Sequence, residues 1–156
     1  MLRAHPRPDA DGLRWVAHEQ WHVTLGFYGT VNDTDHAEIA RIAAEVAGGM
    51  PAPQITLGPR TEQLGRDGTL VVPASGADGL VAELDDALYD VVGPRERFYF
   101  GHLTLARLRR NAVLPAEVLD VECMTSFSPA AIYLLDSETA PTGSVYEVRA
   151  RAPFAV

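Results

Sequence analysis

The sequence of 156 residues contains no lysine, a single cysteine and no long hydrophobic run. With only Cys123, no disulfide can form within the chain, which favours a reducing compartment. The first twenty residues lack the apolar segment of a signal peptide, and the longest apolar run, residues 130–135, is too short to cross a bilayer. We therefore expect a cytoplasmic protein that has no membrane partner.

Positive charge is also scarce. The 21 acidic residues outnumber the 13 arginines, which gives a net charge of −8. Proteins that bind a long stretch of phosphate backbone are normally basic. The charge therefore argues against duplex DNA as a partner and favours a small phosphorylated group or an RNA end. The complete use of arginine in place of lysine is typical of a GC-rich genome, and we draw no functional conclusion from it.

Several motifs of common catalytic sites are missing. The sequence lacks the G-x-x-x-x-G-K-[ST], G-x-G-x-x-G and G-x-S-x-G patterns of nucleotide-binding and serine-hydrolase sites. The string H-E-x-x-H occurs once, from His18 to His22, but it leads into a segment expected as a strand, whereas the zinc motif needs both histidines on one face of a helix. We expect chemistry that needs no metal, no cofactor and no ATP.

Hydrophobic periodicity predicts an α+β fold rich in antiparallel sheet. One helix is expected to begin with a capping-box-like pair, Asp35 and Glu38, and to end at Gly48-Gly49. A second is expected over residues 78–92, ending at Gly93, and a short helical turn over 115–119. The expected strands are residues 13–16, 21–28, 55–57, 69–72, 98–106, 121–123, 131–135 and 145–152.

A quasi-repeat is the most informative feature of the sequence. His22-x-Thr24-Leu25 and His102-x-Thr104-Leu105 lie 80 residues apart, about half the chain length, and each falls in a strand-like segment. This spacing suggests two related lobes within a single domain, residues 1–156, with each lobe giving one strand to a central cleft.

Alternation along a strand gives these motifs a chemical meaning. Residues i and i+2 point to the same side, so each strand would present one imidazole beside one hydroxyl. Cyclic phosphodiester hydrolysis needs a base to activate water and an acid to protonate the leaving oxygen. Histidine serves either role near neutral pH, and threonine hydroxyls can donate hydrogen bonds to the phosphate oxygens. We therefore predict His22, Thr24, His102 and Thr104 as the catalytic residues.

A single H-x-T-L match carries little information, whereas two strand-placed matches carry much more. The segments QWHVTLGFYG and FYFGHLTLAR resemble the two HxTx signatures of the 2H phosphoesterase superfamily. Within it, they are most similar to the RNA 2′,3′-cyclic phosphodiesterases, also described as bacterial 2′-5′ RNA ligase-like proteins. The segment at residues 127–152 also looks like the C-terminal strands of that branch, so the resemblance extends from about Leu13 to the end.

The resemblance implies a bilobal 2H fold and hydrolysis of a 2′,3′-cyclic phosphate to a 2′-phosphate. It makes His22 the proton donor to the leaving 3′-oxygen and His102 the acceptor that activates water. The residues alone do not distinguish this order from its reverse.

Two features depart from the family pattern. Family members usually have a strand and a helix before the segment that matches residues 13–16, whereas twelve residues precede it here. We thus expect this N-terminal part to be missing or truncated, with a sheet edge exposed. In addition, Gly101 and Phe100 occupy positions where the family usually has Pro and often Arg.

Other candidates would bind the substrate. Arg107 could clamp the phosphate or be a solvated strand-end cation. It belongs to a stretch, residues 95–110, that carries five arginines and one glutamate. Phe27, Tyr28 and Phe100 could stack on a nucleobase, although core packing is the commoner role for such residues. The remaining histidines are expected to be ordinary surface residues.

Taken together, the sequence predicts a monomer that opens 2′,3′-cyclic phosphates on RNA ends or small nucleotides. Two alternatives remain open at this point. One is an ATP-independent 2′-5′ RNA ligase that uses the same site in reverse, and the other is an RNA-end-binding protein without turnover.

Overall fold

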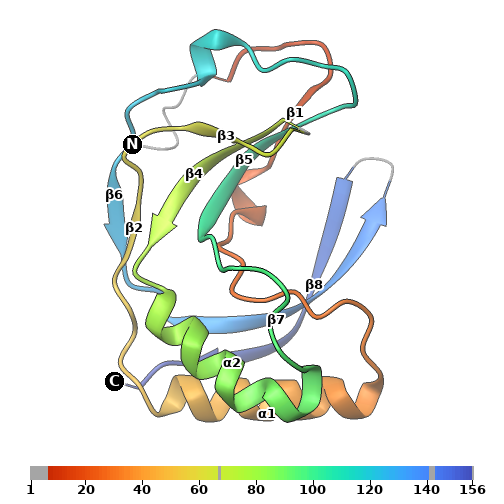
Figure 1. Ribbon diagram of the computed structural model, residues 1–156, viewed down its shortest axis with the longest axis vertical. Helices are drawn as coiled ribbons and strands as arrows, with labels where there is room; N and C mark the ends of the chain where they lie inside the picture. The colour runs from red at the N-terminus through yellow and green to blue at the C-terminus, as the bar shows by residue number, and fades with distance from the viewer. Residues whose placement is uncertain (1–6, 67, 141–142, 156) are drawn as a thin grey trace. The chain divides into compact units, whose positions relative to one another are not determined.

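The computed structural model describes residues 7–66, 68–140 and 143–155 (Figure 1). The chain divides into two compact units, and each is assembled from three separate stretches of sequence. Unit 1 consists of Met1–Leu25, Ile55–Ala77 and Tyr99–Phe127. Unit 2 consists of Gly26–Gln54, Asp78–Phe98 and Ser128–Val156.

Unit 1 is built on an antiparallel sheet with the strand order β1-β5-β4-β2-β6, in which β3 also pairs with β4. Its strands are β1 (Leu13–Trp15), β2 (Ile55–Leu57), β3 (Glu62–Leu64), β4 (Thr69–Ser75), β5 (His102–Leu108) and β6 (Thr125–Phe127). Two short 3₁₀ turns, η2 (His18–Gln20) and η3 (Ala116–Val118), complete the unit. Figure 1 shows β4 and β5 side by side in the middle of this sheet.

The core of unit 1 lies along β4 and β5. Leu70, Val71 and Val72 are consecutive and have no exposed surface, so both sides of β4 are covered. On β5, Leu103, Leu105 and Ala106 are buried. Burying a side chain such as Leu or Val stabilises the fold by about 1.5–3 kcal/mol. These two strands therefore form the rigid part of the unit.

A β-bulge interrupts the pairing of these two strands. Leu70 lies opposite Ala106, but the next residue of β4, Val71, lies opposite Thr104. Leu105 is therefore the extra residue on β5. A bulge shifts the phase of side-chain alternation along its strand, so Leu105 and Ala106 can both face the core.

Unit 2 contains the helices α1 (Asp33–Gly48) and α2 (Asp78–Val92) and the hairpin formed by β7 (Ala131–Ala140) and β8 (Gly143–Pro153). In Figure 1, α1 runs beside α2 and beneath the hairpin, in agreement with the contacts between these elements. The apolar faces of the helices supply most of the core of this unit. The buried residues of the helices are Ile39, Ile42, Ala43, Ala47, Leu80, Val81, Leu84 and Leu88.

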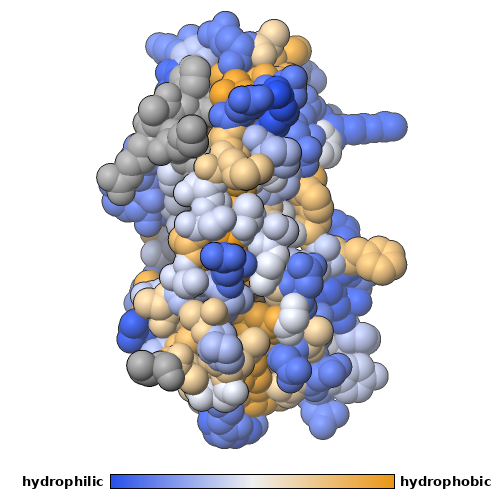
Figure 2. Space-filling model, turned by 90° about the vertical axis from the view of Figure 1, so that its left-hand side faces the viewer, coloured by the Kyte–Doolittle hydropathy of each residue, from blue (hydrophilic) through white to orange (hydrophobic). Residues whose placement is uncertain are grey.

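The mixed α+β class with antiparallel sheets is confirmed. The second helix spans residues 78–92 as predicted, and Gly93 ends it with φ at 76° and its N–H donating to the Tyr89 carbonyl. Within the described residues, no helix is long and apolar enough to cross a membrane. The face shown in Figure 2 mixes hydrophilic and hydrophobic residues in small groups.

Several details of the sequence prediction were wrong. Helix α1 starts at Asp33, because Asn32 caps it: its Oδ1 accepts from the Asp35 N–H and its Nδ2 donates to the Asp35 carboxylate. Glu38 is not a cap partner and instead binds Arg41.

The other errors concern strands. Residues 98–101 are irregular, so β5 begins only at His102, and the stretch between β2 and β4, expected to consist of turns, contains β3. Residues 21–28 form a single bridge at Val23 and no regular strand. Residues 121–123 likewise form one bridge, at Glu122, and the strand β6 begins only at Thr125. Asp120, with φ at 57°, turns the chain immediately before this segment and prevents an extended start.

Candidate active site

Both H-x-T-L motifs lie in unit 1 and pair with each other. The second motif opens β5, and the first meets it through an antiparallel bridge between Val23 and Leu103. The expected distribution of one motif to each lobe therefore differs from the observed one. The two motifs lie in the same unit because β1 and the first motif both pair with the same edge of β5, although they are far from it in the sequence.

The register of this bridge determines how the four side chains are arranged. A bridge between Val23 and Leu103 sets each histidine opposite the threonine of the other motif: His22 opposite Thr104, and Thr24 opposite His102. Directly opposed residues have Cβ atoms about 5 Å apart, and diagonal neighbours lie about 7–8 Å apart. From this bridge we expect the two imidazoles at diagonal positions, each beside a hydroxyl.

Each imidazole is oriented by the same local interaction. His22 donates its Nδ1–H to the Gln20 carbonyl at 2.7 Å, and His102 donates its Nδ1–H to the Phe100 carbonyl at 2.8 Å. A carbonyl can only accept, so Nδ1 must carry the proton in both rings. This assigns proton exchange to Nε2 in both cases. The arrangement therefore provides two matched groups for acid–base chemistry, both half-buried.

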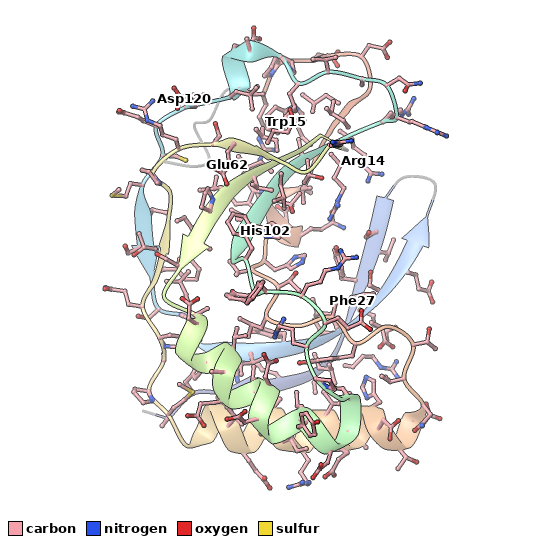
Figure 3. All side chains as sticks on the ribbon, in the orientation of Figure 1. Arg14, Trp15, Phe27, Glu62, His102 and Asp120 are labelled. Atoms are coloured by element: carbon pink, nitrogen blue, oxygen red, sulfur yellow. The ribbon has the colours of Figure 1, made fainter. Side chains whose placement is uncertain are left out.

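The first motif is held by aromatic packing rather than by a strand. The Arg7 guanidinium lies 5.4 Å from the ring centres of both Trp15 and Trp21. Trp15 donates its indole N–H to the Pro8 carbonyl, and the ring of His18 meets Trp21 edge-on at 4.4 Å. Figure 3 shows Trp15 and Arg14 on β1. These contacts anchor the segment that leads into His22.

The second motif is held by its strand and by the residues just before it. The Phe100 ring stacks on the His102 ring, with centroids 5.7 Å apart and planes inclined by 25°. Position 101 has no room for a side chain because the backbone passes close to β4: a Cβ on Gly101 would lie 2.5 Å from the Ala74 carbonyl oxygen. The Gly101 carbonyl accepts from the Ala74 N–H at 2.8 Å. The glycine at position 101 is thus explained by close backbone packing.

Arg107 lies on the same side of β5 as the motif residues because of the bulge. Thr69, Val71 and Pro73 alternate regularly on β4, and they lie opposite Arg107, Thr104 and His102 in turn. In an evenly paired strand, Arg107 lies three residues after Thr104 and would point to the opposite, core side. Its guanidinium is exposed.

The remaining predicted substrate contacts are divided between the units. Phe100 is in unit 1 and 47% exposed, whereas Phe27 and Tyr28 belong to unit 2. Phe27 is 82% exposed, so core packing does not apply to it. Tyr28 is half-buried, and burial raises the pKa of its phenol, with Asp85 adding to this effect and Arg95 opposing it.

The basic stretch at residues 95–110 is less uniform than the sequence suggests. Arg95 binds the Asp85 carboxylate through two hydrogen bonds of 2.7 Å, so its charge is neutralised locally within unit 2. In the part of the chain that the structure describes, no group of three or more His, Cys, Asp and Glu is arranged to hold a metal.

Sequence reasoning missed two groups of the site, the backbone carbonyls of Gln20 and Phe100, which orient the imidazoles of His22 and His102. Each precedes its histidine by two residues, and only the local backbone conformation reveals the contact. The sequence contains no side-chain signal for it.

Comparison with known proteins finds similarity in part of the sequence and in the fold. Residues 2–60 match the family model described as LigT like phosphoesterase. TT0787 of Thermus thermophilus is similar with a TM-score of 0.78 and 23% identity, over 92% of this chain and 83% of that chain. E. coli LigT complexed with NADP+ gives 0.70 and 21%, over 95% and 84%. The same protein complexed with 3′-AMP gives 0.66 and 20%, over 97% and 86%. No curated protein sequence matches.

The chain therefore shares its fold with these solved structures. The family match covers residues 2–60, the segment that contains the first H-x-T-L motif.

Proposed function

We propose that this protein hydrolyses a 2′,3′-cyclic phosphate at the end of an RNA or on a small nucleotide, giving a 2′-phosphate. The observation that carries this proposal is the matched pair of imidazoles. His22 and His102 lie on segments bridged at Val23 and Leu103, and both are oriented through Nδ1. Two histidines that exchange protons at equivalent atoms, about one phosphate apart, suit an in-line displacement at phosphorus.

The two histidines would take opposite roles. Nε2 of His102 accepts a proton from water as the water oxygen bonds to phosphorus. Protonated His22 gives its proton to the 3′-oxygen as the bond between phosphorus and that oxygen breaks. The order follows the resemblance to the family. Each cycle leaves His22 neutral and His102 charged, and proton exchange with solvent resets both.

The threonines and Arg107 would stabilise the transition state. Negative charge accumulates on the non-bridging phosphate oxygens during the displacement, and fixed donors at these oxygens lower the barrier. Thr24 and Thr104 lie beside the histidines on the same side of the bridged strands, and the bulge brings Arg107 to that side. A guanidinium can donate two parallel hydrogen bonds to a phosphate.

A nucleotide is the ligand class that the comparisons favour. The solved LigT structures include complexes with 3′-AMP, NADP+ and ATP. The net charge of −8 supports a small or terminal substrate over a long nucleic acid.

The test is turnover of adenosine 2′,3′-cyclic phosphate by the purified chain in EDTA, with the product identified by phosphorus NMR. We expect adenosine 2′-phosphate, and a rate that is bell-shaped in pH because one imidazole must be charged while the other is neutral. Formation of the 3′-phosphate would reverse the assigned leaving group. Absence of turnover, or turnover only after addition of a divalent metal, would contradict the proposal.

A further inference from the structure

Two arginines face each other across the edge of the sheet in unit 1. Arg14 on β1 lies directly opposite Arg107 on β5, and Arg107 lies directly opposite Thr69 on β4. Directly opposed residues of an antiparallel sheet point to the same side. The three side chains therefore form one row across three strands, on the same side as His102 and Thr104.

This pairing is unfavourable without a ligand. Like charges directly opposite each other destabilise a sheet. Both guanidiniums are exposed, and within the described ranges 7–66, 68–140 and 143–155 neither has an ion pair or a hydrogen bond. The chain is rich in carboxylates, and four other arginines do have such partners: Arg41, Arg60, Arg95 and Arg149. A pair of opposed arginines without a carboxylate thus has the character of an anion-binding position.

We propose that Arg14 and Arg107, together with the Thr69 hydroxyl, bind a second phosphate of the substrate. This inference rests on the proposed function. Because of the bulge, Arg107 is the next residue after Thr104 on this side of β5. The corresponding residues of β4, Val71 and Thr69, are two positions apart, which is about 7 Å along the strand. The position is therefore distinct from that of the cyclic phosphate between the histidines, yet within the span of one nucleotide.

The second phosphate is the one on the 5′-oxygen of the nucleotide that carries the cyclic phosphate. In an RNA end this group is the last internal phosphodiester, and in a free nucleotide it is a 5′-monophosphate. Both present anionic non-bridging oxygens to the two guanidiniums. Arg14 thereby becomes a specificity-determining residue that favours phosphorylated nucleotides over nucleosides.

The experiment compares kcat/KM for three substrates: adenosine 2′,3′-cyclic phosphate, its 5′-phosphorylated form, and a dinucleotide ending in the same cyclic phosphate. For the wild-type chain we expect the two substrates with a second phosphate to exceed the first by about ten- to hundredfold, as for hydrogen bonds to a charged group. The dinucleotide and the 5′-monophosphate arms separate an RNA end from a free nucleotide. Arg14→Gln should reduce the ratio to about one.

Arg66→Gln is the matched control, because it removes the same charge from the exposed turn between β3 and β4 and should preserve the ratio. Arg14→Gln should also raise the melting temperature of the unliganded protein, since it removes the repulsion from Arg107, whereas a purely structural arginine would lower it. Equal rates on all three substrates in the wild type, or an unchanged ratio in Arg14→Gln, would overturn the inference. Absence of turnover on every substrate would instead overturn the proposed function.

Discussion

The two H-x-T-L segments have the same residues and the same histidine geometry, but very different structural support. The second motif opens a seven-residue strand, and its apolar residues Leu103 and Leu105 are 4% and 1% exposed. The first makes one bridge, through the half-buried Val23. Nevertheless, both imidazoles donate Nδ1–H to the carbonyl two residues before them. The feature common to both motifs is thus the local orientation of the ring and not the regular strand.

The largest expected effect tests whether this equivalence is functional. His22→Ala and His102→Ala should each lower kcat on a 2′,3′-cyclic nucleotide by about 10²- to 10⁴-fold, the usual contribution of one general acid or base. The double variant should lose less than the product of the two losses if both groups act in one step. His36→Gln, on α1 in unit 2, should keep normal activity. A folded single variant with near wild-type turnover would show that its histidine is no catalyst.

The second test concerns support rather than chemistry. Leu103→Ala should lower the free energy of unfolding by about 2–5 kcal/mol, because it leaves a cavity beside the buried Val72 of β4. Val23→Ala should cost only about 1 kcal/mol, as expected at a half-buried site. Urea unfolding followed by circular dichroism gives both values. Equal losses would mean that the first motif is as firmly packed as the second.

The smallest effect separates the two hydroxyls. Thr104 is half-buried on β5, whereas Thr24 is exposed on an irregular segment. Thr104→Val should lower kcat by about tenfold, and Thr24→Val by less, since a hydroxyl that is held less firmly contributes less as a fixed donor. The serine variants retain the donor and should recover most of each loss. If a valine variant has the same kcat as the corresponding serine variant, that hydroxyl has no role in the mechanism.

Local patterns predicted much of the fold. Helix α2 follows directly from its apolar spacing and Gly93, and strands such as β2 and β4 from their apolar runs. The cap of α1 was missed because Asn32 and Asp35 satisfy each other, a pairing that competes with the pattern Asp35 to Glu38. Which of two neighbouring residues caps a helix depends on the local backbone geometry, which the sequence does not specify.

The site was predictable as a set of residues but not as an arrangement. The sequence predicted His22 and His102 because the H-x-T-L motif occurs twice. That both lie in unit 1 follows from pairing between segments 80 residues apart, which the sequence does not reveal. The orientation of Arg107 depends on a bulge for which Leu105 gives no sequence signal. The role that we propose for Arg14 follows only from its cross-strand position.

The extra residue in β5 also has a consequence for anyone who transplants this site into another scaffold. Copying His102, Thr104 and Arg107 onto an ideal, evenly paired strand would send the guanidinium into the scaffold interior, because the spacings of two and three residues differ in parity. A faithful graft must carry over the one-residue mismatch with β4, or shorten the pattern by a residue. The spacing H-x-T-x-x-R therefore places its three side chains on one side only when the neighbouring strand has one residue fewer over the same stretch.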